Sequence, residues 1–302
     1  MKITRTEKWT LRPSAADRQA LCETVTLYQR YVRALSSVCR VHWPTLGVLN
    51  GNAVIRVVEG LVHPTAKRPS VRYGFFHRVF YKFPSYLRRS AIMDAMGQVR
   101  SFLSRYDTWQ TATHRRHKHE RPPMFGVSNS FPSLYKGQCV KYAEDLSFAE
   151  IKVYKDCDWV WIKVPIKQIG RRAGDVNQKR VSPLLVVTNK QTALAVPFEQ
   201  AVTLKPKHAE VVCAVDLGIN TSITASVVRS DGTVLGRQFI RRPRDIDRLH
   251  KRLSMIRTAA KKTKRVSRGF AARWYRKGYN IARNSAHQMT RALVEFARSL
   301  GA

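Results

Sequence analysis

The chain has 302 residues, of which 44% are hydrophobic, so it is long enough and apolar enough to form two folded domains. This composition excludes an intrinsically disordered protein. Its 55 Lys and Arg against 20 Asp and Glu give a net charge of +35, far more than solubility requires, and a polyanionic partner is the simplest explanation. For any single basic patch, a merely solvated surface is the alternative.

Cysteine content and hydropathy indicate the cellular compartment in which the protein is expected. The five cysteines are odd in number and form no C-x-x-C pair, so we predict neither a disulfide framework nor a zinc site. No run approaches the roughly 18 apolar residues needed to cross a bilayer, and no apolar signal segment opens the sequence. We therefore expect no membrane partner, and a cytoplasmic, nucleic-acid-associated protein of a prokaryote.

The N-terminal part is predicted to begin with one strand and to continue with helices. Residues 3–11 are rich in β-prone side chains. Ser14 then opens a capping-box-like start to an amphipathic helix that ends near Trp43. Residues 44–84 are interrupted by Gly and Pro, and a second amphipathic helix covers about 87–106. Four arginines are expected on the solvent side of this helix: Arg88, Arg89, Arg100 and Arg105.

A histidine-containing segment follows this helix. Residues 113–123 are basic and polar and end in two prolines, which is typical of a linker or an exposed loop. His114, His117 and His119 could be metal ligands. Since Arg and Lys separate them and no cysteine accompanies them, we favour a solvated basic loop.

Short strands dominate the middle of the chain. Between residues 125 and 204, apolar β-prone runs alternate with Gly and Pro, which favours a small antiparallel barrel. The strand at residues 3–11 would complete this barrel, so the helices become an insertion in it. We place the boundary to the last domain at residues 205–207.

Residues 211–240 most constrain the chemistry. Five consecutive apolar residues, 211–215, predict a strand buried on both faces, and Asp216 ends it. A carboxylate at the end of a buried strand is costly unless a cation or hydrogen bonds compensate, so we interpret Asp216 as functional. Asp231-Gly232 predicts a tight hairpin, and the segment therefore forms three antiparallel strands.

Two basic helices are predicted after these strands. Between residues 237 and 283 there are 17 Lys and Arg against two Asp, which favours phosphate binding over a solvated face. Aromatic residues lie among the cations in WYRKGY, residues 274–279, as suits base stacking. The residues predicted to bind nucleic acid are Arg88, Arg89, Arg241, Arg242, Arg244, Arg248, Arg252, Lys261, Lys262, Lys264, Arg265, Arg268, Arg273, Trp274, Arg276 and Lys277.

A hairpin meander with an acid on its first strand begins both the RNase H-like fold and the phosphate-binding lobe of the actin and sugar-kinase fold. The charge favours the former, because an enzyme of small substrates has no need of such a surplus. The stretch VDLGINTSITASVV, residues 215–228, resembles the first RuvC motif of the TnpB proteins of insertion sequences and of the type V CRISPR effector nucleases. Residues 83–103 and 121–131, the β region and the Arg-rich helices agree in order with that family.

The resemblance implies an α+β protein of three parts. A small wedge-like β barrel is formed by residues 1–13 and 121–206, a helical recognition lobe by 14–120, and an incomplete RNase H-like (RuvC) domain by 207–302. It also implies two partners, a guide RNA and a target double-stranded DNA. In such proteins base pairing reads the sequence, while the protein holds the backbone.

The family's chemistry is Mg²⁺-dependent DNA cleavage, which needs clustered carboxylates around two metal ions about 4 Å apart. Asp216 matches the first metal ligand and catalytic residue of the family. The second and third acids have no counterpart here, so we expect a C-terminally truncated member that does not cut DNA. A naturally nuclease-inactive guided repressor is the alternative, followed by an actin-fold phosphotransferase or an ordinary basic nucleic-acid binder. The guide RNA, the adjacent DNA motif and the oligomeric state stay open.

Overall fold

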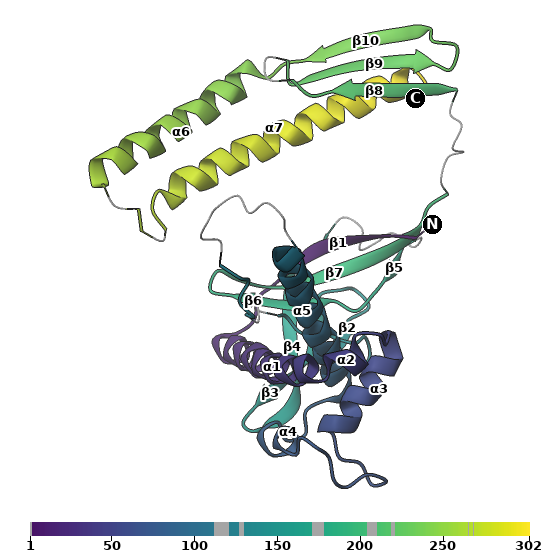
Figure 1. Cartoon of the computed structure of the whole chain (residues 1–302), viewed down its shortest axis with the longest axis vertical. Helices are drawn as coiled ribbons and strands as arrows, with labels where there is room; N and C mark the ends of the chain where they lie inside the picture. The colour runs from purple at the N-terminus through teal and green to yellow at the C-terminus, as the bar shows by residue number, and fades with distance from the viewer. Residues whose placement is uncertain are drawn as a thin grey trace. The chain divides into compact units, whose positions relative to one another are not determined.

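The fold is taken from a computed structural model, which describes residues 2–111, 121–126, 130–170, 178–203, 210–218, 221–264, 266–267 and 269–302. The chain divides into two compact units, Met1–Val202 and Thr203–Ala302. Each unit contains antiparallel strands and helices, so the chain is an α+β protein, as predicted (Figure 1). In the described part of the chain, no helix is long and apolar enough to span a membrane.

A curled antiparallel sheet forms one layer of the first unit. Its strand order is β2-β3-β4-β1-β7-β5, and β6 pairs with β7. The first strand of the chain therefore lies between β4 and β7, with Lys2 opposite Ala201 in the pair with β7. The strands are β1 (Lys2–Leu11), β2 (Val140–Tyr142), β3 (Phe148–Lys155), β4 (Asp158–Gln168), β5 (Lys179–Arg180), β6 (Leu184–Thr188) and β7 (Gln191–Ala201).

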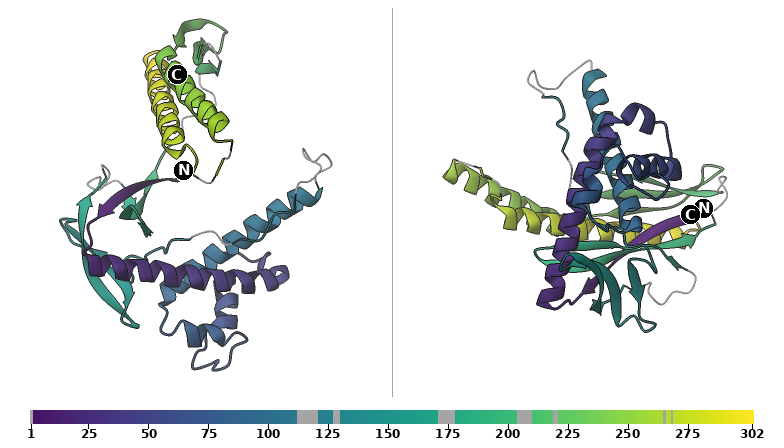
Figure 2. Two further views of the ribbon diagram at one scale, coloured as in Figure 1. Left: turned by 90° about the vertical axis from the view of Figure 1, so that its left-hand side faces the viewer. Right: turned by 90° about the horizontal axis from the view of Figure 1, so that it is seen from below.

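In the described residues of this unit, five helices accompany the sheet: α1 (Ala15–Val41), α2 (Trp43–Leu46), α3 (Gly51–Val62), α4 (Phe75–Val79) and α5 (Ser85–Thr111). The predicted start of the first helix is confirmed, because the Ser14 hydroxyl accepts a hydrogen bond from the Asp17 backbone N–H at 3.1 Å. The second predicted helix is also confirmed and is longer than expected. It packs across α1 (Figure 2).

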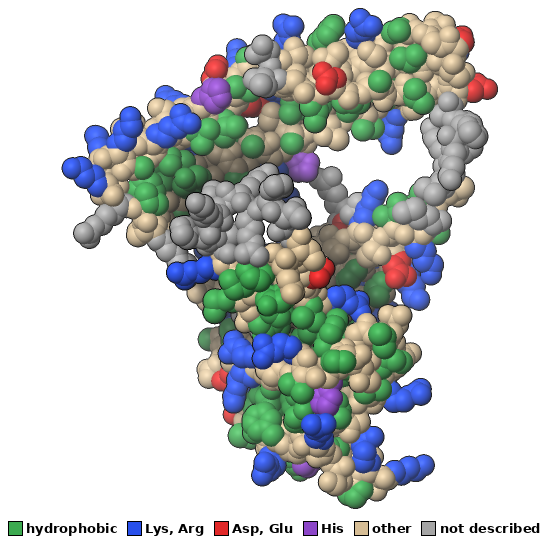
Figure 3. Space-filling view, in the orientation of Figure 1, with side chains coloured by type: hydrophobic (Ala, Val, Ile, Leu, Met, Phe, Trp, Pro, Cys, Tyr) green, Lys and Arg blue, Asp and Glu red, His purple; other side chains and the backbone are tan. Residues whose placement is uncertain are grey.

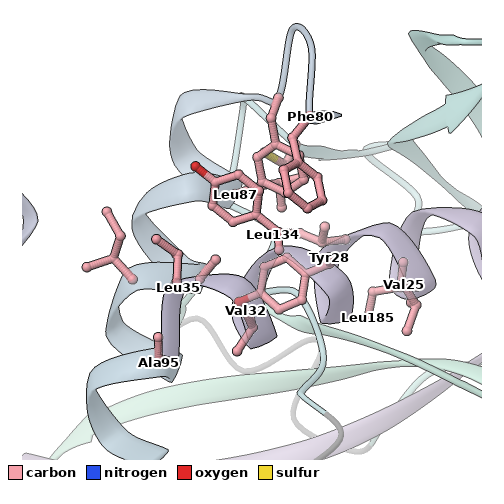
Figure 4. Close-up of a cluster of buried hydrophobic side chains, with 14 of the residues drawn as sticks. Val25, Tyr28, Val32, Leu35, Phe80, Leu87, Ala95, Leu134 and Leu185 are labelled. Atoms are coloured by element: carbon pink, nitrogen blue, oxygen red, sulfur yellow. The ribbon is translucent and has the colours of Figure 1, made fainter. Parts of the chain in front are cut away.

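The core of the first unit lies where α1, α5 and the sheet meet. Leu35 and Leu87 are fully buried there, and Figure 4 shows them beside the ring of Tyr28. The Tyr28 hydroxyl donates a hydrogen bond to Asp94 Oδ2 at 2.8 Å and lies 2.9 Å from Ser90 Oγ. Burial raises the pKa of the Asp94 carboxyl and of the Tyr28 hydroxyl above their ordinary ranges. The network therefore satisfies polar groups that the core encloses.

The second unit has the three predicted antiparallel strands, β8 (Val211–Asp216), β9 (Ile223–Arg229) and β10 (Val234–Ile240), in the order β10-β9-β8. The Asp231-Gly232 turn is confirmed: Gly232 has a φ of 90°, and Asp231 Oδ1 accepts from the Thr233 N–H at 2.8 Å. Two long helices follow, α6 (Pro243–Thr263) and α7 (Ala272–Ser299).

Helix α7 covers one face of this small sheet. Ile223, Ala225 and Ile240 form its buried cluster, and Leu293 and Phe296 of α7 pack against them. A Cβ at Gly236 would lie 2.7 Å from Leu300 Cδ1, so a larger residue there would require the Leu300 side chain to move.

The prediction that residues 211–215 form a strand buried on both faces is wrong. Among the described residues β8 pairs with β9 alone, and it lies at the edge of the sheet. Val212 is 53% exposed and Val215 45% exposed. A continuous apolar run indicates a strand but not its position in the sheet, and here β9 is the central strand.

Three sequence-based predictions lie outside the described residues. They are the domain boundary at residues 205–207, the histidines at positions 114, 117 and 119, and the cations Arg265 and Arg268.

Candidate nucleic-acid interface

One side of α6 is an exposed cationic surface. Ile256 is buried on its inner side, and Ile246 and Leu249 are half-buried. Figure 3 shows Lys and Arg side chains along this helix. The exposed cations of α6 and of the residue that follows it are Arg244, Arg248, Lys251, Arg257, Lys261, Lys262 and Lys264.

Helix α7 adds exposed cations and aromatic rings. Arg273, Arg276 and Lys277 are exposed in its first turns. Tyr275 is 55% and Tyr279 is 65% exposed, four residues apart and therefore on one face of the helix. Neither tyrosine was among the predicted site residues, although both lie in the WYRKGY segment, and their i, i+4 spacing beside cations was the available signal.

Four arginines gather where α6 begins. Together with Pro243 and Asp245, they line a hollow of about 430 Å³, and they are Arg241, Arg242, Arg244 and Arg248. Asp245 Oδ2 lies 3.3 Å from Arg242 Nε, and Asp245 Oδ1 lies 3.5 Å from Arg248 Nη1. One carboxylate thus orients two guanidinium groups and leaves the hollow positive.

The backbone adds to this positive potential. The N-cap residue of α6, Arg242, makes no side-chain hydrogen bond to the first turn. Pro243 at the first helical position has no N–H, and the N–H groups of Asp245 and Ile246 donate to the Arg242 carbonyl. The helix start therefore contributes mainly through its dipole, which places a partial positive charge there. Guanidinium groups and a helix start together fit the oxygens of a phosphate.

A second hollow lies further along the hairpin. Trp274 of α7 lines it with the α6 residues Ser254, Met255, Thr258, Ala259 and Lys262, and its volume is about 310 Å³. The indole is half-buried, which leaves part of the ring accessible. An aromatic ring beside an ammonium group suits a base and its phosphate.

Two predicted contacts differ from the rest. Arg252 is half-buried, and its Nη1 donates to Met255 Sδ at 3.4 Å, so it faces the hairpin more than the solvent. Arg89, in the first unit, is accessible, with its side chain 51% exposed and its Nε 3.8 Å from Glu59 Oε1.

The prediction that Arg88 is available to solvent is wrong. Its side chain is 9% exposed, and Arg88 Nε donates to Glu59 Oε1 at 3.0 Å. Glu59 belongs to α3, which packs against α5 and brings its carboxylate over the inner side of this helix. Arg88 is therefore buried in the first unit and paired with Glu59.

Asp216 is the residue predicted to be catalytic and to bind the metal. It is exposed at the end of β8, opposite Thr224, and Thr224 is opposite Phe239 on the next strand. The described residues contain no group of three or more His, Cys, Asp or Glu side chains that could hold a metal ion. A single carboxylate with a threonine as its partner in the strand register does not fit the carboxylate cluster that two Mg²⁺ ions require.

Two comparisons with known proteins bear on this chain. A model of the Aq_aa04 family matches residues 5–155, half of the chain, from β1 to the end of β3. No curated protein matches the sequence.

Proposed function

The chain belongs to the Aq_aa04 family, and we propose that it is a nucleic-acid-binding protein whose α6–α7 hairpin holds a phosphate backbone. The observation that carries this proposal is the exposed cationic side of α6, which begins at the hollow lined by Arg241, Arg242, Arg244 and Arg248. The hollow supplies guanidinium groups for one phosphate, and the following turns supply cations for its neighbours.

The extent of the surface favours a polymer over a small anion. At about 1.5 Å per residue, a helix of 21 residues is roughly 31 Å long. Exposed cations occur from Arg244 in its first turn to Lys264, the residue that follows it. A single phosphate would occupy only one of these positions, whereas a nucleic-acid backbone presents a charge to each turn.

A narrower proposal is RNA-guided DNA binding of the TnpB and type V effector kind. The resemblance of residues 215–228 to a RuvC motif supports it, as does the extended cationic surface of α6, because guided proteins hold the backbone while the RNA reads the sequence. In this proposal the first unit corresponds to the wedge-like barrel with its recognition lobe, the second to the RuvC-type domain, and the partners are guide RNA and target DNA. Since the residues around Asp216 do not fit a two-metal site, we propose no cleavage step.

Charge removal at the hollow tests the general proposal. Arg244→Gln/Arg248→Gln removes two charges at the start of α6, and the matched control Arg291→Gln/Arg298→Gln removes two exposed charges near the end of α7. We expect the first variant to bind a fluorescent 30-nucleotide RNA roughly 10-fold more weakly, with the slope of log K against log salt reduced by about two. Equal affinities and slopes for the two variants would overturn the assignment of the hollow.

Sequence dependence tests the narrower proposal. RNA that co-purifies with the chain is sequenced, and the complex is offered a DNA duplex that is complementary to the RNA or a scrambled one. We expect the complementary duplex to bind at least about 10-fold more tightly. Equal binding of the two duplexes would exclude guided recognition and leave nucleic-acid binding as such in place.

A further inference from the structure

One face of the sheet in the first unit carries aromatic rings among lysines. In the strand register Lys152 is opposite Trp161, Glu150 is opposite Lys163, and Lys141 is opposite Glu150. Residues directly opposite one another, and alternate residues along a strand, point to the same side of a sheet. The Trp161 face is therefore formed by Lys141, Phe148, Glu150, Lys152, Trp161 and Lys163 on β2, β3 and β4.

Two aromatic rings on this face, those of Trp161 and Phe148, each have lysine ammonium groups close by. Lys141 Nζ lies 4.8 Å and Lys152 Nζ lies 6.0 Å from the centre of the Trp161 ring. Lys163 Nζ lies 5.3 Å from the centre of the Phe148 ring. Each aromatic ring is thus beside at least one ammonium group, and these positions suit cation–π contact.

The hydrophobic core does not require Trp161. The other side of the same strands supplies most of this part of the core, where Ala149, Ile151 and Val164 are fully buried. Trp159 packs against the core at the start of β4. Trp161 is 38% exposed and is not among the residues packed against that core. A large exposed aromatic ring on a sheet is a surface that a flat partner can cover.

We propose that the Trp161 face binds single-stranded nucleic acid, with a base stacked on the indole and phosphates paired with Lys141, Lys152 and Lys163. Three cations against one acid, Glu150, make the face complementary to a polyanion. A stacked base displaces the ammonium groups from the ring toward the phosphates on either side. A base within a duplex is already stacked on its neighbours, so the face selects unpaired strands.

This inference goes beyond the proposed function, because it concerns the unit Met1–Val202 and uses no residue of α6 or α7. It adds a preference for unpaired bases to the backbone binding that the cations of α6 carry in the general proposal. Either surface can therefore fail without the other.

The test compares bases with phosphates. The full chain is titrated with fluorescent dT15 and with an abasic oligonucleotide of the same length. Each titration is done with the wild-type hairpin and with Arg244→Gln/Arg248→Gln, so that binding at the Trp161 face can be told apart from binding at the hairpin. Trp161→Ala is expected to weaken dT15 binding about 10-fold in both backgrounds and to leave abasic binding unchanged. Trp161→Phe keeps a ring and is expected to restore most of the dT15 affinity.

Tyr106→Ala is the matched control, since Tyr106 is also 38% exposed and lies on α5. Unchanged dT15 binding by Trp161→Ala, or an equal loss for dT15 and the abasic strand, would overturn the proposal. Photo-crosslinking of 4-thiothymidine-containing dT15 to the wild-type chain covers the case of a variant that does not fold. Crosslinked peptides from residues 140–168 support the proposal, and their absence from the crosslink map overturns it.

Discussion

The two units are stabilised by different amounts of apolar burial. In the first, the core cluster extends from Trp9 on β1 to Phe198 on β7 and takes in residues from all five helices. In the second, the corresponding cluster has three buried members among the described residues, Ile223, Ala225 and Ile240. Since burial is the main favourable contribution to folding, the first unit is stable by its own packing and the second is held by much less.

Repulsion between like charges lowers the stability of the second unit further. Like charges four residues apart on a helix repel one another, and α6 carries such pairs at Arg244 and Arg248 and at Arg257 and Lys261. A small core thus supports a self-repelling hairpin. A polyanion removes that repulsion, so binding and the stability of this unit are linked.

Equivalent truncations in the two cores give the largest expected difference. Leu87 is fully buried in the first unit, whereas Leu293 is half-buried in the second. Leu87→Ala should lower the free energy of unfolding of its unit by about 3 kcal/mol, and Leu293→Ala by about 1 kcal/mol. Hydrogen exchange during urea titration of the full chain reports each unit separately. Equal losses would contradict the difference in core size.

Two neighbouring arginines on α5, Arg88 and Arg89, are expected to differ, one contributing to stability and the other to binding. Arg88→Ala leaves the partly buried Glu59 carboxylate without its nearest cation and should cost about 2 kcal/mol in the first unit, as measured by urea unfolding. Arg89→Ala removes a half-exposed side chain and should change stability by less than about 0.5 kcal/mol while lowering the salt slope of RNA binding by about one. The comparison fails if Arg88→Ala, at a temperature where it is folded, binds RNA as weakly as Arg89→Ala.

The smallest expected effect concerns pH in the first unit. Burial raises the pKa of the Asp94 carboxyl in the folded state. The first unit is therefore most stable while Asp94 is protonated, and its free energy of unfolding falls as the pH rises through that pKa. Asparagine stays neutral and can still accept the Tyr28 hydrogen bond. Asp94→Asn should therefore gain in urea midpoint relative to the wild type as the pH rises above about 4, the ordinary range of an Asp carboxyl. A difference that is constant from pH 3 to 7 would show that Asp94 does not titrate in this way.

Local signals predicted the elements well. The Ser14 cap, the Asp231-Gly232 turn and the cationic helices after residue 240 each depend on residues close in sequence. The pairing of elements was not accessible in this way. Arg88 lies on a helix whose amphipathic pattern cannot show that Glu59, 29 residues earlier, reaches it from α3.

The same distinction holds for the two candidate binding surfaces: one depends on residues close in sequence and the other on strand pairing. The cations of α6 could be predicted because a helical face is periodic in sequence. The Trp161 face could not, since it depends on the register that brings β2 to β3 and β3 to β4. The edge position of β8 was missed for the same reason, because strand order is a property of the whole sheet.

The central place of β1 governs the order in which the first unit can be assembled on the ribosome. Its partners β4 and β7 are made long after it, and Lys2 meets Ala201 across almost the whole length of the unit. A ribosome that has completed α5 has made neither neighbour of β1. The helices α1 and α5 can pack first, and the oldest strand of the nascent chain is among the last to be paired.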